Sequence, residues 1–198
     1  MGHLISGFVM GMLVLAACGG PRETVRSQQL AQVYARTSGV TYPANDFARP
    51  TPIEVGQYVV YGIRHGGTLT ISTYEILGRA NDRSWRVHRH MMSEHVDQRD
   101  TFLVNDRELP EICHAPGTLI VLGQRYPGGV GPQTTVVGGV FKGTTMMSTE
   151  VKLNGRLHMM QGLYNAAVPL TGLISGKTAD FSVELLEFGR FRTAMEMR

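Results

Sequence analysis

The chain has 198 residues and a formal net charge of +3, and 42% of its residues are hydrophobic while 18% are charged. This length and composition indicate one globular domain with a tail, and they exclude wholesale disorder. The mild, evenly spread charge argues against a nucleic-acid-binding protein, and a count of 2 cysteines excludes a disulfide-rich scaffold or a four-cysteine zinc site.

The N-terminus carries an apolar run, Leu4 to Ala17, that is too short to span a membrane and has the length of a signal-peptide core. It ends in Leu15-Ala16-Ala17-Cys18-Gly19, which resembles the lipobox of bacterial lipoproteins. The resemblance implies a signal peptide over residues 1–17 and a mature chain that begins at Cys18, modified with diacylglycerol and an N-linked acyl chain such as palmitate. Because Gly19 and not Asp follows the cysteine, the resemblance implies the outer membrane, on its periplasmic side. A secretory signal with a coincidental cysteine is the alternative.

Residues 18–54 are predicted to hold this acylated N-terminus, one helix and an extended link. The helix is expected from Arg22 to Arg36, because apolar residues recur there at helical spacing and form one face. Three prolines between Thr37 and Pro52 favour an extended segment.

Residues 55–198 are predicted to form an antiparallel β-domain, because alternation and turn residues replace the helical pattern. The predicted strands are Gln57–Ile63, Thr68–Leu77, Ser84–Met91, Val96–Val104, Thr118–Gln124, Thr134–Lys142, Thr144–Leu153, Arg156–Met159, Val168–Ser175 and Phe181–Phe191. Turns are predicted at Arg64–Gly67, Gly78–Asp82, Pro127–Pro132 and Gly176–Lys177, and Asn154-Gly155 favours a two-residue hairpin turn.

This order of helix, link and meandering strands is similar to the outer-membrane lipoprotein carrier and receptor superfamily. The resemblance is carried by Val168–Ser175 followed by Glu184–Gly189, by the opening Val55–Tyr61 and by Ser84-Trp85. It implies a mainly β fold, a curved antiparallel sheet or half-open β-barrel with an N-terminal helix and an apolar concave face. Only one helix is evident where that superfamily has several, and no protruding apolar receptor loop can be matched. No functional residue is therefore carried over.

The sequence holds none of the motifs that mark common enzyme sites, such as a nucleophile elbow, a P-loop or a dinucleotide fingerprint. We therefore expect no catalytic residues. His88 and His90 fall on one face of a predicted strand, with Glu94 and His95 nearby, which is a conceivable zinc or copper half-site. The polar face of an amphipathic strand explains the same two histidines, and we expect no metal there.

Methionine and arginine are both concentrated in parts of the chain. Six of the 11 methionines occur as the pairs Met91-Met92, Met146-Met147 and Met159-Met160. Neighbouring residues of a strand point to opposite faces, so the pairs favour core or cavity lining over a copper site. Six arginines, Arg79, Arg83, Arg86, Arg89, Arg99 and Arg107, form either a solvated face or a surface for anionic phosphates.

The function that the sequence favours is the binding of an apolar ligand, such as the acyl chain of a lipid or lipoprotein, in the concave face. The expected contributors act by burial and are Val59, Tyr61, Leu69, Ile71, Met146, Met159, Leu170 and Leu173. The alternative is a structural or assembly subunit that anchors a larger cell-envelope complex to the outer membrane, docking through sheet edges or the Arg22–Pro52 arm. No cofactor is expected beyond the lipid on Cys18, and Cys113 is expected to be buried.

Overall fold

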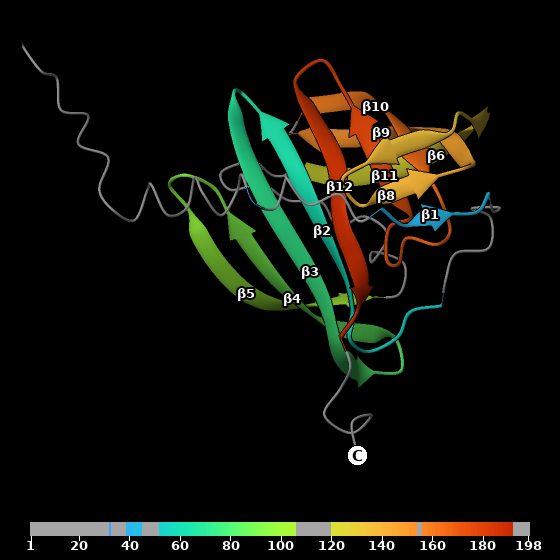
Figure 1. Cartoon of the computed structure of the whole chain (residues 1–198). Helices are drawn as coiled ribbons and strands as arrows, with labels where there is room; N and C mark the ends of the chain where they lie inside the picture. The colour runs from blue at the N-terminus through green and yellow to red at the C-terminus, as the bar shows by residue number, and fades with distance from the viewer. Residues whose placement is uncertain (1–31, 33–38, 45–51, 106–119, 154–155, 192–198) are drawn as a thin grey trace, which may run out of the picture.

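The structure of the chain is a computed structural model that describes residue 32 and residues 39–44, 52–105, 120–153 and 156–191. This part of the chain is mainly β, with nine strands in one sheet of order β5-β4-β3-β2-β12-β11-β10-β9-β6 and three in a small sheet of order β1-β8-β7 (Figure 1). The strands are β1 Thr41–Tyr42, β2 Gln57–His65, β3 Thr68–Asn81, β4 Ser84–Met92, β5 Asp97–Asn105, β6 Ile120–Gly131, β7 Thr134–Val136, β8 Gly139–Phe141, β9 Thr144–Leu153, β10 Arg156–Tyr164, β11 Leu173–Lys177 and β12 Phe181–Arg190.

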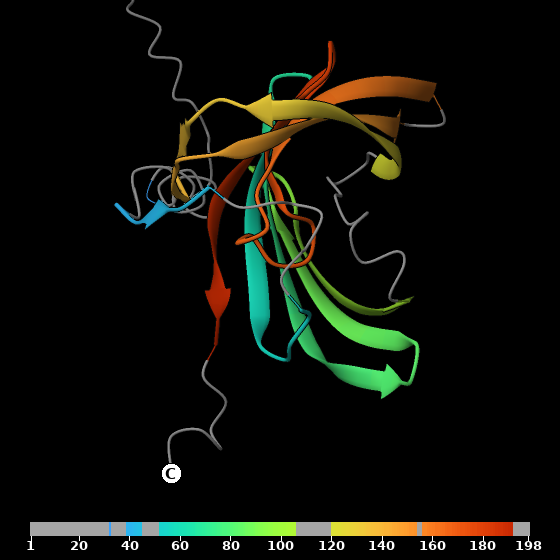
Figure 2. The ribbon, with the colours of Figure 1, turned by 90° about the vertical axis from the view of Figure 1, so that its right-hand side faces the viewer.

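The large sheet is antiparallel throughout and open. Strands β2 to β5 form a meander, and β9 to β12 form a second one to which β6 adds at the edge of β9. The two meanders join where β2 pairs with β12, from His65 opposite Phe181 to Gln57 opposite Arg190. Strands β5 and β6 lie at the two ends of the order, so the described strands form no closed barrel. Figure 2 shows β3, β4 and β5 bending along their length, with β6, β9 and β10 crossing near their upper ends.

The two faces of the sheet carry separate apolar clusters. Side chains alternate along a strand, so Val59, Tyr61 and Ile63 lie on one face of β2, which we call the inner face. All three are fully buried and belong to the main core, which also takes in β4, β10, β11 and residues of the small sheet. The opposite, outer face carries a smaller cluster that centres on Val60 and Ile71.

The outer-face cluster depends on an irregularity in β12. The register of β12 against β2 shifts between Leu185 and Glu187, and this shift lets Leu186 join the outer cluster while Leu185 stays in the main core. The hydroxyl of Tyr58 donates to Glu187 at 2.7 Å on the same face. Burial, followed by this hydrogen bond, raises the pKa of Tyr58 to about 12.

The small sheet packs on the inner face beside β12. Its strand β1 pairs parallel with β8, and Tyr42 of β1 stacks on Phe141 with ring centroids 4.9 Å apart. Tyr42 also contacts Phe188 of β12, again at 4.9 Å. The turn between β7 and β8 reaches the same strand, because Gly138 N–H donates to the Leu185 carbonyl at 3.1 Å.

Strand positions from β2 to β5, β9 and β12 agree with the predicted ones to within a few residues. Strand β10 begins at Arg156 as predicted but runs to Tyr164 and not only to Met159. The antiparallel β9–β10 pairing is the one that Asn154-Gly155 predicts. One predicted turn and two predicted strands were wrong. Pro127–Pro132 is no turn, because β6 continues to Gly131 with a register shift between Pro127 and Gly129, and an edge strand tolerates the proline.

The other two errors concern predicted strands that the chain interrupts. Thr134–Lys142 is split into β7 and β8, because a turn forms at Val137-Gly138 and Gly139 takes a φ of 144°. Val168–Ser175 begins as a buried turn, and β11 starts only at Leu173 and runs through the predicted turn at Gly176. The predicted turn at Gly78–Asp82 was too long, since β3 runs to Asn81 through two register shifts. The predicted Arg22–Arg36 helix lies outside the described residues apart from Gln32.

Two glycines allow a test of how tightly the sheet ends are packed. Gly56 has a φ of 81°, and a Cβ there would lie 2.8 Å from the Phe191 carbonyl oxygen. Gly66 has a φ of 54° in open space. We expect Gly66→Ala to lower the free energy of unfolding by about 1–2 kcal/mol through backbone strain. Gly56→Ala adds a clash with the backbone, and we expect it to lower the free energy of unfolding by about 2–5 kcal/mol in total. Urea unfolding measures the free energy of unfolding of both variants. Equal losses in the two variants would contradict the close contact between Gly56 and the Phe191 carbonyl.

Candidate functional site

The eight residues predicted to bind an apolar ligand do not share one face. Four of them, Val59, Tyr61, Leu170 and Leu173, lie together in the main core. Leu69 and Ile71 belong to the outer-face cluster. Met146 and Met159 are exposed, on the face opposite Met147 and Met160. The structure therefore assembles half of the predicted set on the inner face, and we describe that region as the candidate site.

The inner face at β2 is covered by the connection between β10 and β11, residues Asn165–Gly172, which we call the inner loop. This segment has no strand or helix, yet all of its residues except the half-buried Ala167 are buried. Val168 and Leu170 of the loop are part of the main core. Connections normally run over the protein surface, because a buried one must find partners for its backbone polar groups.

Asn165 supplies several of these partners at the start of the loop. Its side-chain amide donates to the carbonyls of Gly143 at 2.8 Å and Pro43 at 3.3 Å. Its side-chain oxygen accepts from the Ala167 N–H at 2.9 Å, which is the hydrogen bond of an Asx turn. The amide thus ties the inner loop to the segments that flank β1 and β8.

The far end of the loop is held by Tyr61. The Tyr61 hydroxyl, fully buried, is hydrogen-bonded to Thr171 Oγ1 and donates to the Leu173 carbonyl at 3.0 Å. Thr171 Oγ1 in turn accepts from the Leu173 N–H at 3.0 Å. One phenol from the middle of β2 therefore anchors the exit of the inner loop and the first residue of β11.

Leu170 lies between these two anchors in a strained conformation. Its φ of 66° is in the left-handed region, and among the described residues it is the one non-glycine residue found there. An L-residue loses about 1–2 kcal/mol in this region relative to an ordinary conformation. Strain of this kind persists where surrounding packing enforces it, and it clusters at sites that bind or switch.

A second buried tyrosine on the same face serves as a structural comparison. The Tyr164 hydroxyl is hydrogen-bonded to Thr149 Oγ1 at 2.8 Å, and both residues are fully buried. This hydrogen bond joins β9 to β10, and neither of its two residues belongs to the inner loop. The guanidinium of Arg125 lies over the Tyr164 ring at 5.1 Å.

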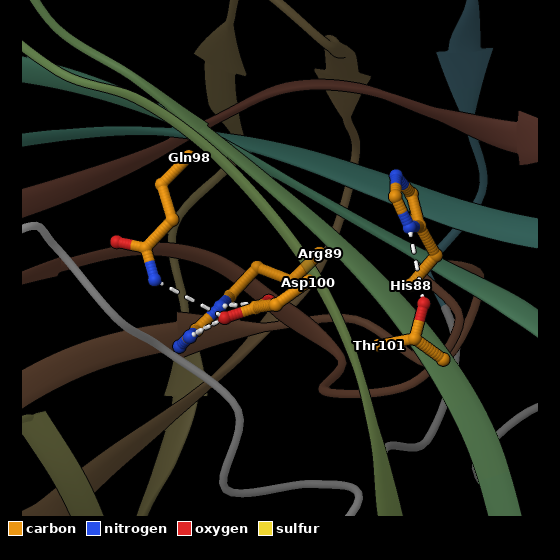
Figure 3. Close-up of polar contacts among 5 residues, drawn as sticks. All are labelled: His88, Arg89, Gln98, Asp100 and Thr101. Carbon is orange, nitrogen blue, oxygen red and sulfur yellow. Dashed lines mark hydrogen bonds and ion pairs between the residues drawn. The ribbon is translucent and has the colours of Figure 1, made fainter.

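The inner face also carries an ion pair towards the β5 edge. Arg89 Nε donates to Asp100 at 2.9 Å, a second guanidinium nitrogen bonds the other carboxylate oxygen, and Gln98 donates to Asp100 at 3.3 Å (Figure 3). The guanidinium lies 5.3 Å from the centre of the Phe102 ring. The hydrogen bond to Asp100 raises the pKa of Arg89. It is a bidentate cross-strand pair that fixes β4 on β5.

The residues of the conceivable histidine half-site have separate partners. His88 contacts Thr101 at 3.4 Å, on the other side of the β4–β5 ribbon from Arg89 in Figure 3. His90 Nε2 lies 2.8 Å from Asp97, while Glu94 and His95 follow in the turn after β4. Within the described ranges, no group of three or more His, Cys, Asp or Glu side chains is placed to hold a metal ion.

The methionine pairs and the arginines are also distributed over both faces. Met91, Met147 and Met160 are buried, while their partners Met92, Met146 and Met159 lie on the opposite face. Arg79 lies over the Trp85 ring at 4.4 Å, and Arg99 lies 3.9 Å from Asp97. Arg107, Cys18 and Cys113 lie outside the described residues.

Sequence reasoning missed the residues that hold the inner loop, above all Asn165 and Thr171. The sequence did contain a signal for them. Asn165 and Thr171 interrupt an otherwise apolar stretch that also holds Pro169 and Gly172, and these residue types favour a turn over a strand. In the described part of the chain, no helix has the length and apolar character needed to cross a membrane. Comparisons with protein-family models, with curated proteins and with solved structures gave no match to this chain.

The Tyr61 anchor makes a testable prediction about the inner loop. Tyr61→Phe and Tyr164→Phe each remove one buried hydroxyl, and each is expected to lower the free energy of unfolding by about 1–3 kcal/mol. Only Tyr61→Phe is expected to speed amide hydrogen exchange between Ala166 and Leu173, because only that hydroxyl bonds the loop exit. Unchanged exchange in Tyr61→Phe, or equal acceleration in both variants, would contradict this role.

Proposed function

We propose that this chain is a lipid-anchored protein of the bacterial outer membrane, on its periplasmic side, that binds an apolar ligand on the inner face of its sheet. The ligand class is the acyl chain of a lipid or of a lipoprotein. In this proposal the bent, open sheet is the half-open barrel of the lipoprotein carrier and receptor superfamily, and Cys18 carries the anchoring lipid.

The observation that carries the proposal is the cover of the inner face. At β2 this cover includes an irregular segment, the inner loop, held by the Asn165 amide and the Tyr61 hydroxyl and containing the strained Leu170. A connecting segment buried over a core is uncommon, because its backbone polar groups lose contact with water and need partners within the protein. A strained loop over apolar side chains is suited to displacement by a ligand that takes its place.

The energies allow such an exchange. Uncovering Val168 and Leu170 costs about 1.5–3 kcal/mol for each side chain, and breaking the Tyr61 hydrogen bonds adds about 1 kcal/mol for each bond. Relief of the Leu170 strain returns about 1–2 kcal/mol. An acyl chain gains about 0.8 kcal/mol for each CH₂ group that it transfers from water to an apolar surface. A chain of about a dozen CH₂ groups therefore outweighs the loss.

Native mass spectrometry tests ligand binding directly. The chain from Gly19 onward, directed to the periplasm and purified without detergent, is expected to carry a discrete extra mass of lipid size that mild delipidation removes. An apo mass in every preparation, together with no uptake of added phospholipid, would overturn the proposal.

The two tyrosine variants locate the ligand. If the ligand displaces the inner loop, Tyr61→Phe raises occupancy at limiting lipid, by up to about tenfold, since loosening the closed loop by about 1.4 kcal/mol shifts the equilibrium tenfold. Tyr164→Phe is the matched control, because it loses a comparable buried hydroxyl whose hydrogen bond runs to Thr149 of β9. Equal occupancy in both variants would place the ligand elsewhere.

The anchor has its own test. Cys18→Ala is expected to move the protein out of the membrane fraction or to leave it unprocessed, because the acyl chains that hold it on the bilayer are lost. Labelling with a palmitate analogue gives the direct readout, with Cys113→Ala as the control that keeps its label. An unchanged distribution and no label on the wild-type chain would contradict lipidation.

A second function, as an assembly subunit that anchors a cell-envelope complex, is favoured by one observation. Strands β5 and β6 each have a strand neighbour on one side only within the described part of the sheet. Such edges can accept a strand from another protein. A stable heteromer or ring in the same mass spectra, without lipid, would favour this function over ligand binding.

A further inference from the structure

Residues 40–44 form a short segment that is docked on β8, and we call this segment the clasp. Its strand β1 has 2 residues and pairs parallel with β8. The Val140 N–H donates to the Val40 carbonyl at 2.9 Å. The Lys142 N–H donates to the Tyr42 carbonyl at 3.0 Å. Every residue of the clasp is exposed except Tyr42, which is half-buried, so the clasp lies on the surface and is held by a much shorter ladder than the strands of the large sheet.

Tyr42 is the side chain that anchors the clasp. Its ring stacks on Phe141 and contacts Phe188 of β12, with 4.9 Å between the ring centroids in each case. Aromatic pairs of this kind stabilise a contact beyond the area that they bury. Next to them Ala44 comes so close to the turn after β8 that a Cβ at Gly143 would lie 2.4 Å from the Ala44 Cβ. The docking of the clasp therefore depends mainly on one aromatic ring.

The clasp and the inner loop meet at Asn165, which is fully buried. Its side-chain amide donates to the Pro43 carbonyl of the clasp at 3.3 Å and to the Gly143 carbonyl at 2.8 Å. Its backbone closes the loop, because its N–H donates to the Gly172 carbonyl at 2.9 Å and its carbonyl accepts from the Val168 N–H at 3.1 Å. One residue thus contacts the clasp through its side chain and the inner loop through its backbone.

Departure of the clasp changes the surroundings of Asn165 directly. One amide hydrogen loses its acceptor, the Pro43 carbonyl. A buried amide that loses its acceptor needs another partner, and water supplies one only where the loop opens. The exit of the loop is held separately by Tyr61 of β2, so opening begins at the Asn165 end.

We propose that residues 40–44 are a releasable clasp that holds the entrance of the inner loop closed while it is docked on β8. When the clasp leaves β8, the Asn165 end of the loop opens over the inner face. Exposed segments with few contacts are the ones that open locally in native proteins. The opening is a property of the fold, whereas its use in admitting an acyl chain rests on the proposed function. In chain order the clasp lies between Cys18 and β2, so a pull on a lipid anchor reaches the clasp before the large sheet.

Amide hydrogen exchange tests the clasp without any ligand. Tyr42→Ala removes the anchoring ring, and Phe102→Ala is the matched control, because both rings are partly buried against the main core and Phe102 lies on β5 at the far edge of the large sheet. We expect Tyr42→Ala alone to speed exchange of the Asn165, Ala167 and Val168 amides at least about fivefold relative to the amides of β3, the weight of one net hydrogen bond. Equal acceleration in both variants, or none in Tyr42→Ala, overturns the proposal.

A disulfide tests the opposite direction and does not depend on whether Tyr42→Ala folds. Thr41 of the clasp lies opposite Val140 of β8, so Thr41→Cys with Val140→Cys, in a Cys113→Ser background, joins the clasp to β8. We expect the oxidised protein to exchange the same loop amides at least about fivefold more slowly than the reduced protein. Identical rates in the two forms would contradict the clasp.

Lipid uptake separates this inference from the proposed function. The processed full chain with the two introduced cysteines is mixed with the fluorescent fatty acid cis-parinaric acid, and we expect the reduced form to bind it at least about fivefold faster than the oxidised form. Equal uptake together with unchanged loop exchange would refute the clasp and retain ligand binding. Loop exchange that responds to the disulfide, without uptake by either form, would support the clasp and refute acyl binding at the inner face.

Discussion

The pairing of β2 with β12 is the contact on which the rest of this structure depends. It joins the first long strand of the domain to the last and merges two local meanders into one sheet. The register shift at Leu185–Glu187 lets one strand supply apolar residues to both faces in succession. Without this pairing, Tyr61 and the inner loop would belong to separate halves of the molecule, so the candidate site exists only in the complete fold.

The sequence predicted the local meanders well and the irregular segments poorly. Thr68–Leu77 and Ser84–Met91 alternate, although Arg89 interrupts the apolar face of the second, and both are bounded by turn residues, so pattern alone located β3 and β4. Pro127–Pro132 has the composition of a turn, yet tertiary pairing with β9 keeps it in an edge strand. The local preference of these residues for a turn is weaker than the hydrogen bonds that pair them with β9. The sequence of one strand does not show which strand it will pair with.

The candidate site was predicted only in part for a related reason. Apolar character was the reason for predicting Val59, Tyr61, Leu170 and Leu173, and the inner face is where apolar side chains are buried. Leu69 and Ile71 have the same character and alternate in the same way, but the register of β3 on β2 places them on the outer face. Alternation separates two faces without saying which is inner, and the assignment comes from strand pairing across the whole chain.

Two different uses of apolar surface follow from this arrangement. On the inner face, burial is nearly complete and a strained loop supplies part of it, so a ligand would have to replace contacts that already exist. On the outer side of β10, Leu157 and Met159 are exposed, so a molecule that covers them displaces no existing contact. The first process is an exchange and is slowed by the opening of the loop, whereas the second is an addition to an exposed surface.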